Sequence, residues 1–184
     1  MTALMEPTRI ETGEGVAATV EAARAGDAAA FGELYRRFSK SVHAVLLSRL
    51  DPEESREAAQ EVFLTVHRKL AGLQDPAAFG PWVHTIARNH ALSVLRKRGV
   101  RPVEEPLPEL AARPTGESGL RERVLQLIQS LPETYRETLM MRLVEGLTGP
   151  EIAEATGLAA ASVRVNLHRG MGLLRPLVQK EGWR

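Results

Sequence analysis

Residues 148–173 read TGPEIAEATGLAAASVRVNLHRGMGL, which has the spacing of two short helices joined by a tight turn. Ala153 is small enough for two helices to cross closely, Gly157 can adopt the positive φ of a tight turn, and Val163 is apolar where the helices meet. The segment therefore predicts a helix-turn-helix whose second helix covers about residues 160–174.

The ends of this motif are also marked in the sequence. Thr148 and Glu151 have the spacing of a capping box, so the first helix is expected to begin there. Gly170 and Gly172 each cost roughly 1 kcal/mol relative to alanine inside a helix. These glycines predict that the second helix frays toward its C-terminal end.

The second helix carries a one-sided charge. Between Glu154 and Glu181 the chain has no acidic residue, whereas Arg164, His168 and Arg169 fall within the helix. Such a helix can approach phosphate without repulsion, which favours a DNA-binding motif. Because short spacings of small residues also recur by chance in helical proteins, a purely structural helix pair is the alternative.

The net charge of the chain is only +1, so composition alone does not indicate a nucleic-acid partner. Charge is nevertheless segregated along the sequence. Residues 88–101 hold five Lys or Arg and no acid, whereas residues 51–61 hold five acids and one arginine. This pattern is typical of a protein with one face for an anion and another for a basic partner.

Several classes of protein are disfavoured by what the sequence lacks. It has no cysteine, which excludes disulfides and thiolate metal sites. The histidines lack the close spacing of metal ligands, and no phosphate-binding loop or acid–base constellation occurs, so we expect no metal, no cofactor and no enzymatic activity. No apolar run approaches the ~20 residues that span a bilayer, and no signal peptide is evident, so we expect a cytoplasmic protein.

Apolar residues recur at steps of three and four through most of the chain, which predicts an all-α fold. Residues 100–120 break this pattern with four prolines and four glutamates, and are expected to form a linker that reaches ~70 Å when extended. It is either a plain spacer or a segment with a binding role. The predicted parts are a flexible N-terminus (1–15), a helical domain (16–99), the linker (100–120), a second helical domain (121–178) and a tail (179–184). Helices are expected at about 16–25, after Asp27, and at 53–70, 79–98, 121–130, 132–145, 148–156 and 160–174. The helix after Asp27 is expected to bury a single apolar stripe, which consists of Phe31, Leu34, Tyr35, Phe38, Val42, Val45 and Leu46.

The helix predicted at 53–70 has two distinct faces. One face is apolar and should be core, with Val62, Phe63 and Val66 at its centre. The opposite face places Leu64 among acidic side chains, a combination that a partner protein often covers. The alternative is a solvated face with one stray leucine.

The helix predicted at 79–98 also has two faces. Phe79, Val83, Ile86 and Val94 form its buried stripe, and His90 is expected to lie in the middle of that stripe as a satisfied, partly buried histidine rather than a ligand. A separate polar stripe combines a stacking ring, an amide and a phosphate-binding cation, which suit an opened DNA strand. Its members are Trp82, Thr85, Asn89, Ser93 and Arg96. Alternatively, the indole simply covers the core.

Together these residues match a known family. The run EAAQEVFL at 57–64, followed by WVHTIARN at 82–89 and a basic helix end, strongly resembles region two of sigma-70-type transcription initiation factors. The LPE sequence at 131–133 and the helix-turn-helix resemble region four. Direct passage from one region to the other is similar to the extracytoplasmic-function (ECF) subgroup. The resemblance covers about residues 16–178.

The resemblance implies partners and site residues. The partners are promoter DNA, core RNA polymerase through its β′ clamp coiled coil and β flap, and an anti-sigma factor. The polymerase-binding surface is implied at Glu57, Gln60, Glu61 and Leu64. Reading of the upstream promoter element is implied at Ser162, Arg164, Val165, His168 and Arg169. Melting and capture of a flipped base of the downstream element are implied at Gln74, Asp75, Pro76, Ala77, Trp82, Asn89, Arg96, Lys97 and Arg98.

Two other functions remain open from the residues alone. A stand-alone helix-turn-helix regulator would bind specific duplex DNA without polymerase. A helical interaction protein of the anti-sigma type would contact no DNA, and would leave the basic segment 88–101 without a role.

Overall fold

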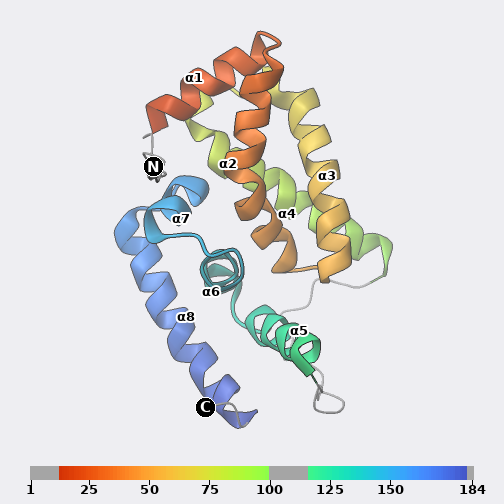
Figure 1. The fold of residues 1–184 in the computed structure, drawn as a ribbon, viewed down its shortest axis with the longest axis vertical. Helices are drawn as coiled ribbons and strands as arrows, with labels where there is room; N and C mark the ends of the chain where they lie inside the picture. Colours follow the sequence, from red (N-terminus) through yellow and green to blue (C-terminus); the bar gives the residue numbers. More distant parts are fainter. Residues whose placement is uncertain (1–12, 100–115, 182–184) are drawn as a thin grey trace, which may run out of the picture.

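The structure is a computed structural model that describes residues 13–99 and 116–181, and within them it contains helices and no strand (Figure 1). Residues 1–12 of the expected N-terminus, residues 100–115 of the expected linker and the last three residues lie outside the described ranges, whereas residues 13–15 of the expected N-terminus belong to the first helix. The N-terminal bundle comprises α1 (Gly13–Arg24), α2 (Ala28–Leu47), α3 (Pro52–Lys69) and α4 (Phe79–Lys97), with 3-10 turns η1 (Leu70–Gly72) and η2 (Pro76–Ala78) between the last two. The C-terminal bundle comprises α5 (Gly116–Gln129), α6 (Glu133–Leu139), the π turn η3 (Met140–Val144), α7 (Gly149–Thr156) and α8 (Ala160–Lys180).

Side-chain caps fix where the N-terminal helices begin. The Asp27 carboxylate accepts hydrogen bonds from the backbone N–H groups of Ala29 and Ala30 at the start of α2. Asp51 caps α3 in the same way, accepting from the N–H of Glu54, and Pro52 occupies the first turn. These caps satisfy backbone donors that a helix start leaves without partners.

Helix α2 is the centre of the N-terminal bundle and packs against α1, α3 and α4. Its residues Val42, Val45 and Leu46 are fully buried. The Phe38 ring meets the Phe79 ring of α4 edge-on, with 4.9 Å between centroids. This apolar stripe on α2 is the one that the helical periodicity predicts.

Helix α4 buries one histidine that the periodicity did not indicate. His90 is half-buried, as expected for a partly buried member of the apolar stripe, whereas His84 is completely buried. His84 faces α2, where its Nε2 lies 2.9 Å from the Ser41 hydroxyl. Burial lowers the pKa of His84 from 6.5 to about 4, because a low-dielectric environment disfavours the charged ring.

The helix-turn-helix prediction is confirmed in its geometry. The Thr148 N–H donates to the Glu151 carboxylate at 2.6 Å, and the Glu151 N–H donates to the Thr148 hydroxyl at 3.4 Å, which completes the capping box. Gly157 ends α7 with φ +72°, and its N–H donates to the Ala153 carbonyl. Val163 of α8 is buried against the rest of the motif.

The predicted fraying of α8 is wrong, because the helix continues through both glycines and Pro176 to Lys180. Gly170 is buried where α8 crosses α6. A Cβ at this position would lie 2.9 Å from Leu139 Cδ1 and 3.1 Å from Tyr135 Cβ. The close helix crossing therefore offsets the poor helix propensity of glycine.

Two other boundaries in the C-terminal bundle differ from the prediction. Helix α5 begins at Gly116, inside the segment expected to be linker, so the Pro-rich composition sets the boundary only approximately. The helix expected at 132–145 begins after Pro132, and its last turn is the π turn η3. Such turns insert one extra residue into an α-helix and are sensitive to packing rather than to local sequence.

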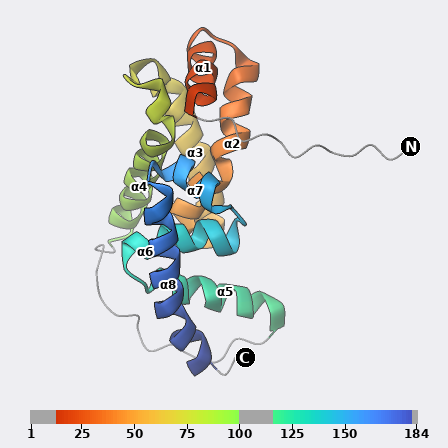
Figure 2. The same ribbon diagram turned by 90° about the vertical axis from the view of Figure 1, so that its left-hand side faces the viewer.

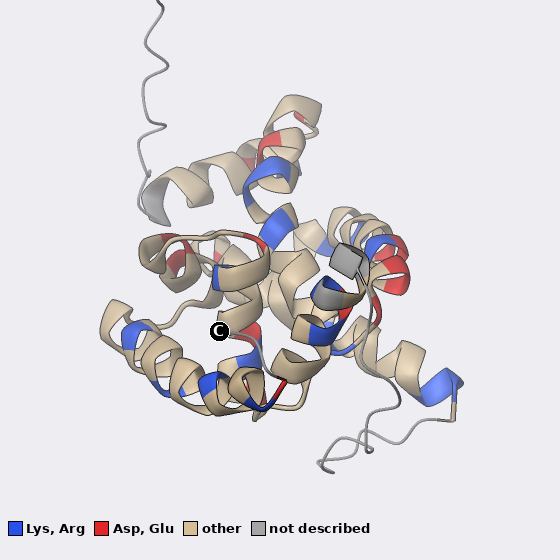
Figure 3. Ribbon diagram, turned by 60° about the horizontal axis from the view of Figure 1, so that its bottom comes forward, with Lys and Arg blue, Asp and Glu red and all other residues tan. Residues whose placement is uncertain are grey.

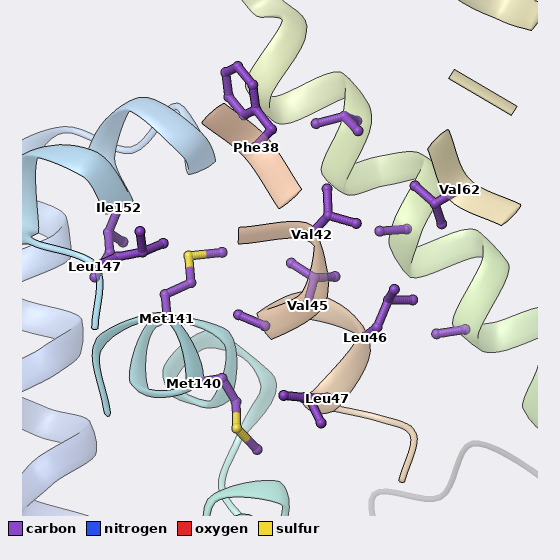
Figure 4. Packing of buried hydrophobic residues seen from close by; sticks show 14 of the residues in the cluster. Phe38, Val42, Val45, Leu46, Leu47, Val62, Met140, Met141, Leu147 and Ile152 are labelled. Carbon is purple, nitrogen blue, oxygen red and sulfur yellow. The ribbon is translucent and has the colours of Figure 1, made fainter. Parts of the chain in front are cut away.

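The two bundles lie against each other, and their buried residues form one hydrophobic core. Figure 4 shows Met141, Leu147 and Ile152 of the C-terminal bundle facing Val42 and Val45 of α2. Figure 2 shows the same proximity from the side, with α7 lying against α2 and α4. Patterns in the sequence locate each bundle but not the contact between them.

Candidate polymerase and nucleic-acid interfaces

The second helix of the helix-turn-helix presents the predicted DNA-reading face to solvent. Five residues were predicted on this face, and all are exposed: Ser162, Arg164, Val165, His168 and Arg169. Val165 is 45% exposed, which is high for an apolar residue. Figure 3 marks the charged residues, and the helix carries no acidic side chain from Ala160 to Lys180. This face can therefore approach a phosphate backbone without repulsion.

Helix α4 presents only part of its predicted polar stripe. Asn89 is exposed, as is Thr85, whose hydroxyl donates to the Pro81 carbonyl at 2.9 Å. Trp82 is half-buried, packs against the core and lies 5.9 Å from the Phe79 ring, centroid to centroid. The indole thus covers the core with one part of its surface and offers the rest to solvent, which combines the two interpretations of this residue.

The loop that leads into α4, residues 74–77, is ordered by a helix-capping hydrogen bond. Gln74, Asp75 and Ala77 are exposed, while Pro76 is half-buried. The Asp75 carboxylate accepts a hydrogen bond from the Ala77 N–H at 3.0 Å, which fixes the short turn η2. The loop predicted to capture a base therefore has a defined backbone at one end of α4.

The basic end of α4 is only partly free for an anion. Arg96, Lys97 and Arg98 are all exposed. Arg98, however, forms ion pairs with Glu54 and with Asp51, the latter at 3.6 Å. The three cations therefore differ in their surroundings, because the acidic start of α3 lies beside the end of α4 and pairs with Arg98.

The predicted polymerase-binding face of α3 is exposed as a whole. Its members are Glu57, Gln60, Glu61 and Leu64. Leu64 is 56% exposed, while Val62, Phe63 and Val66 on the other side of α3 are buried, so the two faces of the helix are those that the periodicity predicts. An apolar side chain within an acidic surface suits a basic partner with a small apolar pocket.

Sequence reasoning missed one aromatic residue next to this helix. Tyr35 was expected in the buried stripe of α2, but its side chain is 46% exposed and its ring lies 4.6 Å from Phe63, centroid to centroid. The only signal for this in the sequence was the polar tip of tyrosine, which favours positions at the edge of a core.

Two other kinds of site are absent from the part of the chain that the structure describes. Among the described helices, none combines the length and apolar character of a membrane span. The same residues include no cluster of three or more His, Cys, Asp or Glu side chains suited to a metal ion.

Comparison with known families identifies the protein family of this chain. Residues 34–101 match the model of Sigma-70 region 2, and residues 121–174 match that of Sigma-70, region 4. The chain belongs to the ECF group of the sigma-70 family. Members of this family are transcription initiation factors that direct RNA polymerase to promoters, and they are not enzymes. The N-terminal bundle is therefore sigma region 2, and the C-terminal bundle is sigma region 4.

Individual relatives are similar along most of this sigma factor. RfaY of Xanthomonas campestris, a probable RNA polymerase sigma factor, is 34% identical over 165 residues, which cover 83% of this chain and 41% of that protein. The ECF sigma-E factor of Haemophilus influenzae is 27% identical over 178 residues, which cover 88% of this chain and 94% of that protein. CnrH, solved in complex with the cytosolic domain of CnrY, has the same fold, with a TM-score of 0.61 and 20% identity over 90% of this chain and 97% of CnrH.

Proposed function

We propose that this sigma factor docks on the β′ clamp coiled coil of core RNA polymerase through α3, reads the upstream promoter element with α8 and opens the downstream element with α4. The observation that carries the proposal is that the predicted residues of α3 and α8 all lie on exposed surfaces, and that each set occupies one face of one helix.

The proposed docking on polymerase can be tested at two residues of α3. Glu61→Lys places a positive charge against the basic partner, and Leu64→Ala removes the exposed apolar contact. We expect each variant to bind core polymerase at least about tenfold more weakly, since about 1.4 kcal/mol corresponds to a factor of ten. Binding of labelled sigma factor to core enzyme by fluorescence anisotropy gives the affinity, and far-UV circular dichroism checks the helix content.

A matched control for this experiment is Glu21→Lys. Glu21 lies on α1 with its side chain 58% exposed and pairs with Arg24 within the same helix. It changes the net charge by the same amount and should leave the affinity unchanged. Equal affinities for wild type, Glu61→Lys and Leu64→Ala, with native helix content, would contradict the proposed docking face.

The proposed reading of the upstream element can be tested on α8. Replacing a side chain that contacts a base edge should cost ~1–3 kcal/mol and remove the preference at one base pair, whereas losing a phosphate contact weakens all sequences alike. We therefore expect Arg164→Ala and Arg169→Ala to reduce binding of the polymerase–sigma complex to a panel of promoter variants. Arg175→Ala, further along the exposed side of α8, is the control. If both variants match the control on every promoter, α8 does not read the element.

For the downstream element we propose a division of labour on α4. The Asn89 amide offers a donor and an acceptor to a flipped base, and the exposed part of Trp82 offers a stacking surface at the point of melting. Arg96 and Lys97 would hold phosphates beside it, and the loop 74–77 would line the base pocket. Arg98 would contribute to phosphate binding only after leaving Glu54 and Asp51.

We also propose two further protein contacts. The β flap of the polymerase would bind region 4, and the support for this is the match of residues 121–174 to the region 4 family model. An anti-sigma factor would hold the protein inactive, and the support for this is the fold relative CnrH, which was solved with the cytosolic domain of CnrY. Such a partner should compete with core polymerase for this sigma factor.

A further inference from the structure

Helix α8 packs mainly against α6, and one buried stripe holds it there (Figure 1). Val163, Gly170 and Leu174 are buried in this stripe, and Leu167 between them is partly buried against the core. These positions follow one another at steps of four, three and four residues, so they share one side of the helix. Three of them carry an apolar side chain and the remaining one is glycine. The backbone of α8 is therefore bare at Gly170, on the side that faces α6.

At Gly170 the two helices lie closer together than a side chain allows. A Cβ on this residue would lie 2.9 Å from Leu139 Cδ1 and 3.1 Å from both Leu139 Cγ and Tyr135 Cβ. Non-bonded carbon atoms normally lie ~3.5–4.0 Å apart, so a methyl group needs roughly half an ångström of additional room. Leu139 Cδ1 ends a flexible side chain, but Tyr135 Cβ is bonded to the backbone of α6 and cannot turn aside. The additional room therefore requires a shift of one helix.

Helix α6 is the more firmly held of the two helices. Its residues Thr138 and Leu139 are buried, as is Met140, which follows directly. The Arg136 guanidinium donates to the Gln129 carbonyl at 3.1 Å, which ties α6 to the last residue of α5. Helix α8, in contrast, has an exposed side opposite its buried stripe. Because a close-packed core yields little, a methyl group at the crossing would push α8 outward rather than α6 inward.

The residues proposed to read DNA lie on α8 at the level of this crossing. Arg169 directly precedes Gly170, and Val165 and His168 lie within about 7.5 Å of it along the helix axis, at 1.5 Å per residue. At 3.6 residues per turn, Val165 and His168 are on the side opposite Gly170. A movement of α8 at Gly170 therefore moves these side chains as well. Binding sites tolerate displacements of only ~0.5 Å, which is about the movement that a methyl group would cause.

We propose that Gly170 is a positioning residue for reading the upstream promoter element. It lets α8 lie close against α6, and thereby sets the distance at which the exposed face of α8 meets the base edges. The inference rests on the proposed function, because it assumes that α8 reads DNA. Alanine is the better helix former, yet it does not fit at this crossing.

Gly170→Ala is the direct test, because it adds one methyl group and removes no contact. Two effects on folding oppose each other, since alanine favours the helix whereas the collision strains the crossing. We therefore expect native helix content by far-UV circular dichroism and a melting temperature within about 4 °C of wild type. Gly32→Ala is the control, because it adds the same group inside α2, where no atom lies within 4 Å.

The DNA probe is a promoter duplex that the wild-type polymerase–sigma complex selects from a randomised pool, together with single-base-pair variants of its upstream element. We expect the complex with Gly170→Ala to bind the selected promoter about tenfold more weakly than wild type, and to discriminate less among the variants. Gly32→Ala should match wild type. On a promoter without an upstream element, and in affinity for core polymerase, Gly170→Ala should also match wild type. A general loss of structure would instead weaken all of these interactions together.

A second substitution can restore the room between the helices. Leu139→Val removes Cδ1, the atom nearest to the added methyl group. We expect the double variant Gly170→Ala/Leu139→Val to recover at least about threefold of the lost promoter affinity, and Leu139→Val alone to bind no better than wild type. Such a rescue would identify the helix spacing, and not the residue type at position 170, as the cause of the loss. Absence of rescue would contradict the proposed role of the crossing.

The arginine variants of α8 separate failure of this inference from failure of the proposed function. Wild-type promoter binding by Gly170→Ala, while Arg164→Ala and Arg169→Ala weaken binding, would overturn the positioning role alone. Unchanged binding in all three variants would overturn the proposed reading by α8, and the positioning role with it. Loss of helix content in Gly170→Ala would also overturn the inference, because glycine would then be needed for folding rather than for the placement of α8.

Discussion

Phe38→Ala is expected to lower the free energy of unfolding by about 3–5 kcal/mol, the usual cost of removing a buried phenylalanine. Phe38 is 2% exposed, and its ring packs edge-on against Phe79. The same ring lies 3.2 Å from the position of a Cβ at Gly80, which is where α7 of region 4 approaches α4. The cavity would therefore weaken the core of region 2 next to its contact with region 4.

The measurement is urea denaturation followed by far-UV circular dichroism, with Leu64→Ala as the control. Leu64 is also a large apolar residue but is 56% exposed, so its loss should cost less than about 1 kcal/mol. Because both regions share one core, we expect wild type to unfold in a single transition. A loss in Phe38→Ala no larger than that in Leu64→Ala would show that the packing around Phe38 contributes little.

Local patterns predict the elements of this fold well, because their causes are local. The capping box of Thr148 and Glu151 and the turn at Gly157 depend on residues within a few positions of one another. The exposed faces of α3 and α8 follow from a period of 3.6 residues, which places Leu64 outside and Val62 inside. The all-α class is confirmed for the same reason.

Features that depend on distant contacts could not be predicted. In the sequence, Gly170 indicates a weak point in a helix. Only the structure shows that α8 crosses α6 at this residue, where a side chain would collide with Leu139 and Tyr135. Glu137 reads as an exposed carboxylate of a short helix, but its partners Arg49 and Arg88 lie 88 and 49 residues away. Nothing near Arg88 in the sequence distinguishes it from the cations proposed to bind DNA.

The candidate sites divide along the same line. Exposure of the α3 and α8 residues is confirmed because surface faces are set by periodicity, whereas their roles remain proposals. On α4 the sequence predicts a single polar stripe, but contacts with neighbouring elements bury its members to different extents. Core contact half-buries Trp82, and the acids at the start of α3 engage Arg98. The helix that is proposed to open DNA thus also packs against α7 of region 4.

The stability of the protein is expected to fall as the pH is lowered from about 6.5 to 4, and His84 is the cause. The folded state takes up a proton at His84 only near pH 4, whereas the unfolded chain takes one up near 6.5. Between these values the unfolded state binds more protons, so acid favours unfolding. Burial is the largest cause of this shift. The charge of Glu137 raises the pKa of His84 and that of Arg88 lowers it, and both contributions are smaller than that of burial.

His84→Gln keeps a polar group beside Ser41 but does not titrate. The free energy of unfolding of wild type should therefore fall by roughly 3 kcal/mol more than that of His84→Gln across this range, at about 1.4 kcal/mol per pH unit. Urea denaturation at a series of pH values gives both curves.

Glu137 does not obscure this result, because its titration acts in a lower range. The pKa of Glu137 lies below its ordinary value of 4.5, so its contribution to stability is complete above pH 4.5 and is lost only as the pH falls below that value. A difference between wild type and His84→Gln that develops from pH 6.5 to 5 therefore belongs to the histidine. Parallel curves from pH 7.5 to 5 would mean that the ring is protonated as easily in the folded protein as in the unfolded chain. That result would contradict the inference that the buried His84 ring beside Ser41 is neutral.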